Sequence, residues 1–291
     1  MNKAITIFTP TYNRAHLLLR LYDSLCSQIS KDFVWLIVDD GSTDNTNNIV
    51  KSWILDDIIN IEYYYQENGG KMRAHNRAVE LCKTDLFVCV DSDDYLASAS
   101  VISDTLSFWH HNNCNMDPHI CGIVSLKKLL GINDCVTFDN YDTITLSELN
   151  SFGFNGETSL VFKTSVIKNY PFPVEDGEKF VTEDIVYDLI DIDYKYLFFP
   201  FFSQICEYQS DGYTKNGMDI MFKNPKGYRR YYNQLTLIGK GNKRYNIQMF
   251  IALSILLKDY SMFSLANNKL LTFVYFPLGI FQYIKLKLGR W

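Results

Sequence analysis

The chain has 291 residues, 47% of them apolar and 21% charged, so it is long enough to bury a large core and too apolar to remain disordered. Its net charge of −5 conceals an uneven distribution: residues 1–214 hold 31 acidic and 15 basic side chains, whereas residues 215–291 hold 2 and 13. No signal-peptide pattern is present, which argues against secretion. The seven cysteines include no CxxC pair, which argues against a disulfide or zinc framework. No apolar run of ~20 residues is uninterrupted, which argues against a membrane-spanning helix.

The first hundred residues alternate between predicted strands and predicted helices. Short apolar runs at 4–8, 33–38, 61–65 and 86–90 are typical of strands. Apolar residues at helical spacing predict a helix in each interval between these strands. The alternation indicates βαβ units and a parallel sheet, in which ligands bind beyond the carboxyl ends of the strands.

From about residue 120 the pattern is less regular and predicts a mixed sheet. The strand-like segments are 120–126, 136–138, 159–162, 196–199 and 204–208. A helix is expected over 183–192, with Ile185, Leu189 and Ile192 on one face. Helical patterns resume at 249–257 and 270–288, where the chain is basic.

These patterns predict two domains. Residues 1–214 are expected to form an α/β catalytic domain with a mixed, mostly parallel sheet flanked by helices. Within it, residues 1–100 would be a nucleotide-binding half and residues 101–214 an acceptor and sugar half. Residues 215–291 would form a basic, aromatic-rich helical extension.

Polar residues follow three of the predicted strands, at 9–14, 39–42 and 91–94. Asp91 and Asp93 are separated by one residue, and two such carboxylates can hold a hard divalent cation, Mg²⁺ or Mn²⁺. The alternative is a polar loop that caps the following helix. Lys71, at a predicted helix start, can bind a diphosphate together with the helix amides, or can simply be solvated.

The glycine-rich phosphate loops of two common nucleotide-binding folds are absent. No GxGxxG follows the first strand, and no GxxxxGK[ST] occurs anywhere in the chain. A nucleotide-binding sheet without these loops needs another source of positive charge, and we expect a metal ion to supply it.

Four motifs, taken in order and spacing, resemble family 2 glycosyltransferases of the GT-A fold. They are Ile7–Arg14, Val38–Asp44, Asn68–Lys71 with Asn76, and Val90–Asp94, and they cover residues 4–100. The resemblance implies a nucleotide-sugar donor that is usually UDP-linked, a divalent metal ion, and inversion at the anomeric carbon.

The resemblance also implies roles for individual residues. Pro10, Thr11, Tyr12 and Asp40 would surround the uridine, Asp91 with Ser92 would lie near the ribose, and Lys71 would approach the diphosphate. Asp93 would bind the metal ion, and Asp91 and Asp94 are further candidate ligands.

Inverting transfer needs a base that takes the proton of the acceptor hydroxyl. The family places it in an acidic pair at a later helix start, which here is Glu183-Asp184. Asp184 is the first choice and Glu183 the second, and an ordinary helix cap is the alternative. Other nearby acids, Glu175, Asp176 and Glu178, are expected to be solvated.

The basic region interleaves cations with aromatic residues and ends in a mainly apolar segment, Leu270–Ile284. Because no nucleic-acid motif accompanies it, we expect an anionic membrane surface as the partner of residues 215–291 and no nucleic acid. A helical subdomain that packs on the body or on another subunit is the alternative.

The sequence therefore predicts an inverting, metal-dependent hexosyl- or N-acetylhexosaminyltransferase. Its donor would be a UDP-sugar and its acceptor a lipid-linked glycan, in the synthesis of a capsule, O-antigen or similar polysaccharide. The protein would be cytoplasmic and peripheral on the inner face of the cell membrane. Two alternatives remain: a nucleotidyltransferase on a related fold, and a non-catalytic nucleotide-binding scaffold.

Overall fold

The computed structural model describes residues 3–112, 117–130, 142–154, 156–207 and 217–289. The chain forms two compact units, Met1–Phe172 with Val186–Gly212 and Pro173–Ile185 with Tyr213–Trp291. Residues 173–185, which sequence analysis assigned to the catalytic domain, thus group with the C-terminal helices. The predicted strand at 136–138 lies outside the described residues.

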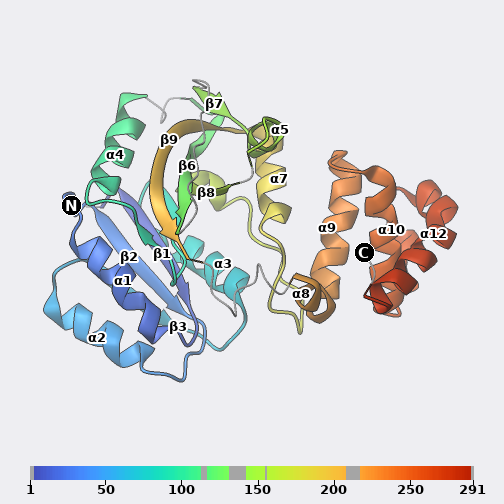
Figure 1. The fold of residues 1–291 in the computed structure, drawn as a ribbon, viewed down its shortest axis with the longest axis horizontal. Coiled ribbons are helices and arrows are strands. Elements are labelled where there is room, and N and C mark those ends of the chain that lie inside the picture. Colours follow the sequence, from blue (N-terminus) through green and yellow to red (C-terminus); the bar gives the residue numbers. More distant parts are fainter. Residues whose placement is uncertain (1–2, 113–116, 131–141, 155, 208–216, 290–291) are drawn as a thin grey trace. The chain divides into compact units, whose positions relative to one another are not determined.

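The first part of unit 1 alternates strands and helices as predicted. Its elements are β1 (Ile5–Thr11), α1 (Ala15–Cys26), β2 (Phe33–Asp39), α2 (Thr46–Asp56), β3 (Ile61–Tyr65), α3 (Lys71–Leu81) and β4 (Leu86–Cys89). The four strands are all parallel and lie side by side in the order β3-β2-β1-β4. Figure 1 labels the first three of them.

The second part of unit 1 adds antiparallel pairing and makes the sheet mixed. Its elements are β5 (Tyr95–Leu96), α4 (Val101–His111), β6 (Ile120–Leu129), β7 (Thr143–Ile144), α5 (Leu146–Ser151), β8 (Glu157–Lys163), α6 (Thr164–Ile167), most of α7 (Asp184–Asp193) and β9 (Lys195–Cys206). The sheet continues from β4 as β8-β6-β9-β5, and β7 pairs with β9. This architecture confirms the predicted α/β class.

Two details of the second part differ from the prediction. The segment expected as a strand at 196–199 and residues 204–206 of the one expected at 204–208 belong to the single strand β9, which pairs with β6 along most of its length. Residue 208 lies outside the described residues. On α7 the buried apolar residues include Ile185, Val186 and Ile190, whereas Ile192 is 60% exposed. The predicted apolar face was therefore right for Ile185, which is buried, and wrong for Ile192, while Leu189 is half-buried.

The core between β2 and its covering helices depends on aromatic packing. Helix α1 buries Leu18, Leu21, Tyr22 and Leu25 at helical spacing, which places them all on one face. The Tyr22 ring stacks on Trp53 of α2 with ring centroids 4.3 Å apart. This packing fixes the scaffold whose strand ends carry the polar motifs.

Unit 2 is a helical bundle with residues 173–185 added to it. Its helices are α8 (Gly217–Lys223), α9 (Pro225–Ile238), α10 (Lys243–Leu256), α11 (Met262–Leu265) and α12 (Lys269–Lys287). Helix α10 is central, since a continuous run from Met249 to Ser254 is buried. Helix α12 packs closely on it, because a side chain at Gly279 would overlap Ile251.

The two helices predicted in the basic region are confirmed as α10 and α12, with α10 starting earlier than expected. Pro277 lies inside α12 and does not end it. Over the described ranges, none of the helices combines the length and apolar character needed to cross a membrane.

Candidate functional site

The three polar segments that follow β1, β2 and β4 meet at one edge of the sheet. The last paired residue of β1, Thr11, lies opposite Asp39 of β2, and the Asp40 amide donates to the Thr11 carbonyl at 2.8 Å. On the other side of β1, the Val90 amide donates to the Phe8 carbonyl at 2.9 Å. Parallel pairing of these strands thus assembles the predicted donor-site residues, as expected for an open α/β sheet.

The loops after β1 and β2 are tied to each other by side-chain hydrogen bonds. Asn13, which has a positive φ of 54°, accepts from the Thr43 amide at 2.8 Å, and its own amide donates to the Ser42 hydroxyl at 2.9 Å. The Asp44 carboxylate accepts from the Ala15 amide at 3.0 Å. The backbone beside Tyr12 is therefore held in one conformation.

The predicted uridine residues on β1 offer an unsatisfied polar atom and an exposed ring. The Thr11 hydroxyl is buried and has no hydrogen-bond partner among the described residues, which is unusual for a buried polar atom. Next to it, the Tyr12 side chain is 49% exposed. Pro10 is half-buried in the same strand.

Asp40 is turned toward the loop that precedes α3. Its carboxylate accepts from the Gln66 side-chain amide at 2.7 Å and from the Gly69 and Gly70 amides at 2.9 and 2.7 Å. Gly70 caps α3 with a positive φ of 95°, a conformation that suits glycine. Asp40 thus shapes the start of α3, and its contact with a nucleotide stays a prediction.

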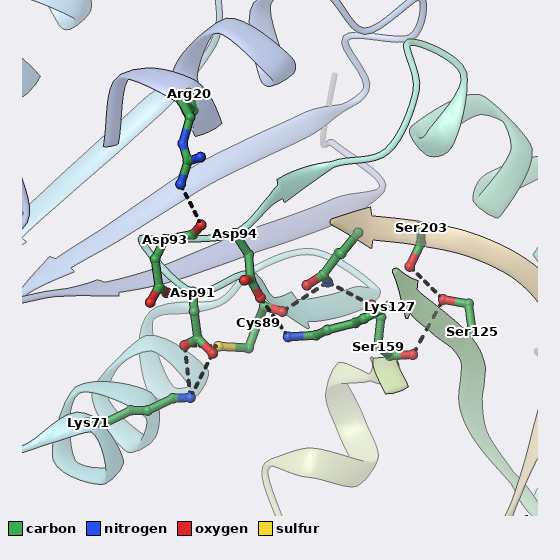
Figure 2. A network of polar contacts seen from close by, with 11 residues as sticks. Arg20, Lys71, Cys89, Asp91, Asp93, Asp94, Ser125, Lys127, Ser159 and Ser203 are labelled. Carbon is green, nitrogen blue, oxygen red and sulfur yellow. Dashed lines mark hydrogen bonds and ion pairs between the residues drawn. The ribbon is translucent and has the colours of Figure 1, made fainter. Parts of the chain in front are cut away.

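Lys71, the first residue of α3, reaches the first carboxylate of the Asp91-Ser92-Asp93-Asp94 segment. Its Nζ lies 2.8 and 3.0 Å from the two carboxylate oxygens of Asp91 (Figure 2). Burial opposes ionisation of Asp91, but Lys71 and Lys127 outweigh it and lower the pKa of this carboxyl. A lysine at this position would also lie near a diphosphate bound at the helix start.

Asp94 forms a buried ion pair with Lys127 of β6, with Nζ and Oδ2 2.8 Å apart (Figure 2). The two side chains are only 8% and 10% exposed. Burial and the neighbouring carboxylates raise the pKa of Asp94 to about 6, although Lys127 opposes that rise. For Lys127, the nearby carboxylates raise its pKa even though burial opposes them.

Sequence reasoning missed Lys127. The signal was a lysine pair, Lys127-Lys128, within the otherwise apolar strand 120–129. A period-2 alternation places one of the two side chains on each face of the sheet, but it does not tell which one meets a carboxylate.

In the sequence, Asp93 lies between Asp91 and Asp94, and its carboxylate has no ion-pair partner among the described residues. Burial and the Asp91 charge raise the pKa of this carboxyl. Such a group would be stabilised by a cation, and Mg²⁺ is commonly held by one or two carboxylates together with substrate phosphates. The residues present therefore fit a cation at Asp93, although the described residues contain no cluster of three His, Cys, Asp or Glu side chains.

The backbone around the acidic segment is braced from several elements. The Asp94 amide donates to the Asp91 carbonyl at 3.0 Å, which forms a tight turn about the buried Ser92. Arg20 of α1 donates to the Asp93 carbonyl at 3.3 Å and pairs with Glu207 at 2.6 Å. Residues 208–216, which follow Glu207, lie outside the described residues.

The candidate base belongs to unit 2. Asp184 is the first residue of α7 and is exposed, and Glu183 before it is half-buried. Burial raises the pKa of Tyr228 on α9, and the Asp184 charge raises it further. The sheet-edge residues belong to unit 1, so the proton-transfer role of Asp184 stays a prediction.

The fold and this sheet edge define an α/β domain of the GT-A class. Residues 6–128 match the model of glycosyl transferase family 2. A teichoic acid poly(glycerol phosphate) polymerase from Staphylococcus epidermidis is 36% identical over 102 residues, which are 35% of this chain. The match spans 14% of the length of that relative.

Two solved structures share the fold. S. aureus TarS 1–349 in complex with UDP-GlcNAc superposes with a TM-score of 0.61 at 18% identity, covering 97% of this chain and 81% of that one. The mannosyltransferase PcManGT from Pyrobaculum calidifontis, in complex with GDP-Man and Mn²⁺, has a TM-score of 0.55 at 15% identity and covers 99% and 83%. These likenesses confirm the predicted GT-A fold.

Proposed function

We propose that this protein is an inverting glycosyltransferase of surface-polysaccharide synthesis that moves a sugar from a UDP-sugar to a lipid-linked glycan acceptor. The observation that carries the proposal is the convergence of Thr11, Tyr12, Lys71 and Asp91–Asp94 at one sheet edge of a family 2 domain. The naming of a similar protein as a teichoic acid polymerase supports a role in surface polymers.

In this proposal the donor lies across the carboxyl ends of β1, β2 and β4. The exposed Tyr12 ring packs against the base, and a polar group of the nucleotide satisfies the buried Thr11 hydroxyl. Lys71 and the first amides of α3 face the diphosphate. The TarS complex with UDP-GlcNAc supports this choice of donor class.

Asp93 would hold Mn²⁺ or Mg²⁺ together with the diphosphate oxygens, because Asp91 and Asp94 already face lysines. A bound divalent cation supplies charge neutralisation of the departing diphosphate. The Mn²⁺ in the PcManGT complex supports this assignment.

In the proposed reaction, Asp184 and Lys71 have different roles. Asp184 accepts the proton of the acceptor hydroxyl while the hydroxyl oxygen forms a bond to the anomeric carbon. The bond between that carbon and the diphosphate oxygen breaks on the opposite face, so the configuration inverts and UDP leaves. Lys71 stabilises the negative charge that develops on the leaving group.

A donor panel tests the proposed activity. Purified protein is incubated with Mn²⁺ and single UDP-sugars, GDP-mannose or nucleoside triphosphates, and released nucleotide and pyrophosphate are measured. We expect UDP release from one UDP-sugar that rises with a lipid-linked acceptor. Pyrophosphate release would instead identify a nucleotidyltransferase, and nucleotide binding without any release would identify a scaffold.

Helix α12 presents an apolar face to solvent. Its exposed apolar residues recur at helical spacing, and Leu270 and Phe273 are 73% and 71% exposed. The other members of this outer face are Val274, Ile280, Phe281 and Ile284 on the helix and Leu288 at its C-cap. Contiguous apolar surface of this kind is typical of an interaction site.

The charge around this outer face favours an anionic lipid surface. Lys269, Lys285 and Lys287 lie on α12, and Lys285 stacks over the Phe281 ring at 5.0 Å. Residues 215–291 contain only two acidic side chains, and one of them, Asp259, is paired with Arg229. We propose that α12 lies in the headgroup layer of the membrane that carries the acceptor.

Vesicle sedimentation checks the membrane proposal. The protein should sediment with vesicles that contain phosphatidylglycerol and much less with pure phosphatidylcholine. Replacing both Phe273 and Phe281 with Ser should weaken binding at least about tenfold, because each buried phenyl ring contributes ~1.5–3 kcal/mol. Leu237→Ser, at an exposed site on α9, is the matched control and should bind normally. Equal sedimentation of the wild type and both variants would contradict the proposal. A wild-type dimer that the double variant dissociates would also contradict it, because the outer face of α12 would then bind a second copy of the chain.

A further inference from the structure

A buried glutamate joins residues 173–185 to the helical bundle of unit 2. Glu178 is only 7% exposed, and its two carboxylate oxygens accept from the Lys226 and Gly227 amides at 2.7 and 2.8 Å. These amides belong to the first turn of α9, where helix N–H groups lack internal partners and negative charge is stabilised. The expectation that Glu178 is solvated was therefore wrong.

A second buried side chain, Asn224, holds the next two residues of the segment. It is the N-cap of α9, and its side-chain oxygen accepts from the Lys179 and Phe180 amides at 2.9 and 3.0 Å. Its side-chain nitrogen donates to the Ile220 carbonyl at 2.8 Å. Asn224 thus hydrogen-bonds to backbone groups of both residues 179–180 and helix α8, which restricts the conformation of the segment where it meets α9.

Close packing continues along α9. A Cβ atom at Gly227 would lie 3.2 Å from the Phe180 carbonyl oxygen and 3.3 Å from the Val181 side chain. A larger residue at this position would therefore push the segment away from the helix.

The contacts extend to the candidate base. Gln234 of α9 donates to the Ile185 carbonyl at 2.8 Å, and Asp184 lies close enough to Tyr228 for its charge to affect that phenol. Between Pro171 and Glu183 the described chain has no helix or strand of its own. The contacts with α9 therefore help to fix its conformation.

We propose that α9 is a platform that holds the Glu183-Asp184 pair in place for proton transfer, with Glu178 and Asn224 as its positioning residues. This inference rests on the proposed function, in which Asp184 is the base. A catalytic carboxylate must be held within a narrow range of positions, and a displacement of about 1 Å can lower a rate about 100-fold. The basic C-terminal region would thereby contribute to catalysis indirectly, by positioning the base.

The test separates turnover from donor binding. Glu178→Gln keeps the shape of the side chain but replaces one accepting oxygen with an amide that cannot accept. We expect kcat to fall about 10- to 100-fold while UDP affinity, which depends on unit 1, is unchanged. Gly227→Ala, which removes no hydrogen-bonding group, should lower kcat in the same way.

The matched control is Glu175→Gln. Glu175 lies in the same segment and pairs with the exposed Arg230 side chain at 2.9 Å, so we expect nearly normal kcat. Thermal unfolding of each variant shows whether unit 2 remains folded at the assay temperature.

A double variant shows whether Glu178 acts through Asp184. In an Asp184→Asn background, Glu178→Gln should lower the residual rate less than twofold, because no base is left to position. An equally large loss in both backgrounds, or an unchanged kcat in Glu178→Gln and Gly227→Ala, would overturn the positioning role. Full transfer by Asp184→Asn alone would instead refute the proposed base and the platform role together.

Discussion

Lys127→Met is expected to lower the free energy of unfolding by about 3–5 kcal/mol, since it leaves the buried Asp94 carboxylate without its partner. Methionine keeps most of the volume of lysine, so lost packing contributes little to the effect. The charge of Asp94 would then be opposed by burial and by Asp91 and Asp93. Urea unfolding at pH 7.5 measures the change.

Two further variants isolate the pair. Replacing both residues, as Asp94→Asn with Lys127→Met, should recover about 0.5–3 kcal/mol relative to Lys127→Met alone, because no uncompensated charge remains. Lys128→Met, on the same strand but exposed, should stay within about 0.5 kcal/mol of the wild type. If Lys127→Met unfolds like Lys128→Met, the buried pair has no stabilising role.

Asp184→Asn is expected to lower the transfer rate by about 10²–10⁴-fold without changing the affinity for UDP. Asparagine has the same shape as aspartate but cannot accept the acceptor proton, and general bases contribute rates of this size. Steady-state transfer with the UDP-sugar selected in the donor panel gives kcat, and titration with UDP gives the binding constant.

A control residue lies at the far end of α7, and the alternative base, Glu183, directly precedes this helix. Asp193→Asn, at the other end of α7, should retain normal transfer. Glu183→Gln should lower the rate much less than Asp184→Asn. If the large loss follows Glu183 instead, that residue is the base, and if neither variant loses activity, the acidic pair has no role in proton transfer.

Within unit 2, two acidic residues of the segment 173–185 contact the basic region of the sequence. Glu175 pairs with Arg230, and Glu178 is held by the amides of α9. The acid-rich part of the chain therefore supplies one partner for the basic region. From composition alone, we expected such a partner in another molecule. The proposed membrane face on α12 involves a different set of residues.

The sequence by itself was sufficient for the fold class and for the resemblance to family 2 glycosyltransferases over its first part. Periodicity marks strands and helices locally, and the carboxyl ends of parallel strands must meet at one edge. The motifs at Thr11, Asp40 and Asp91 were therefore brought together as predicted. These inferences need only the local periodicity of the sequence and the rule that the carboxyl ends of parallel strands lie at the same edge of a sheet.

Only the tertiary structure showed which side chains from segments far apart in the sequence are in contact. Which lysine of Lys127-Lys128 meets Asp94 depends on the register of β6, and the buried face of α7 depends on the elements that cover it. The burial of Glu178 depends on α9, which lies nearly fifty residues further along the chain. A local pattern carries no information on such pairings, because their free energy arises only when two remote segments lose water together.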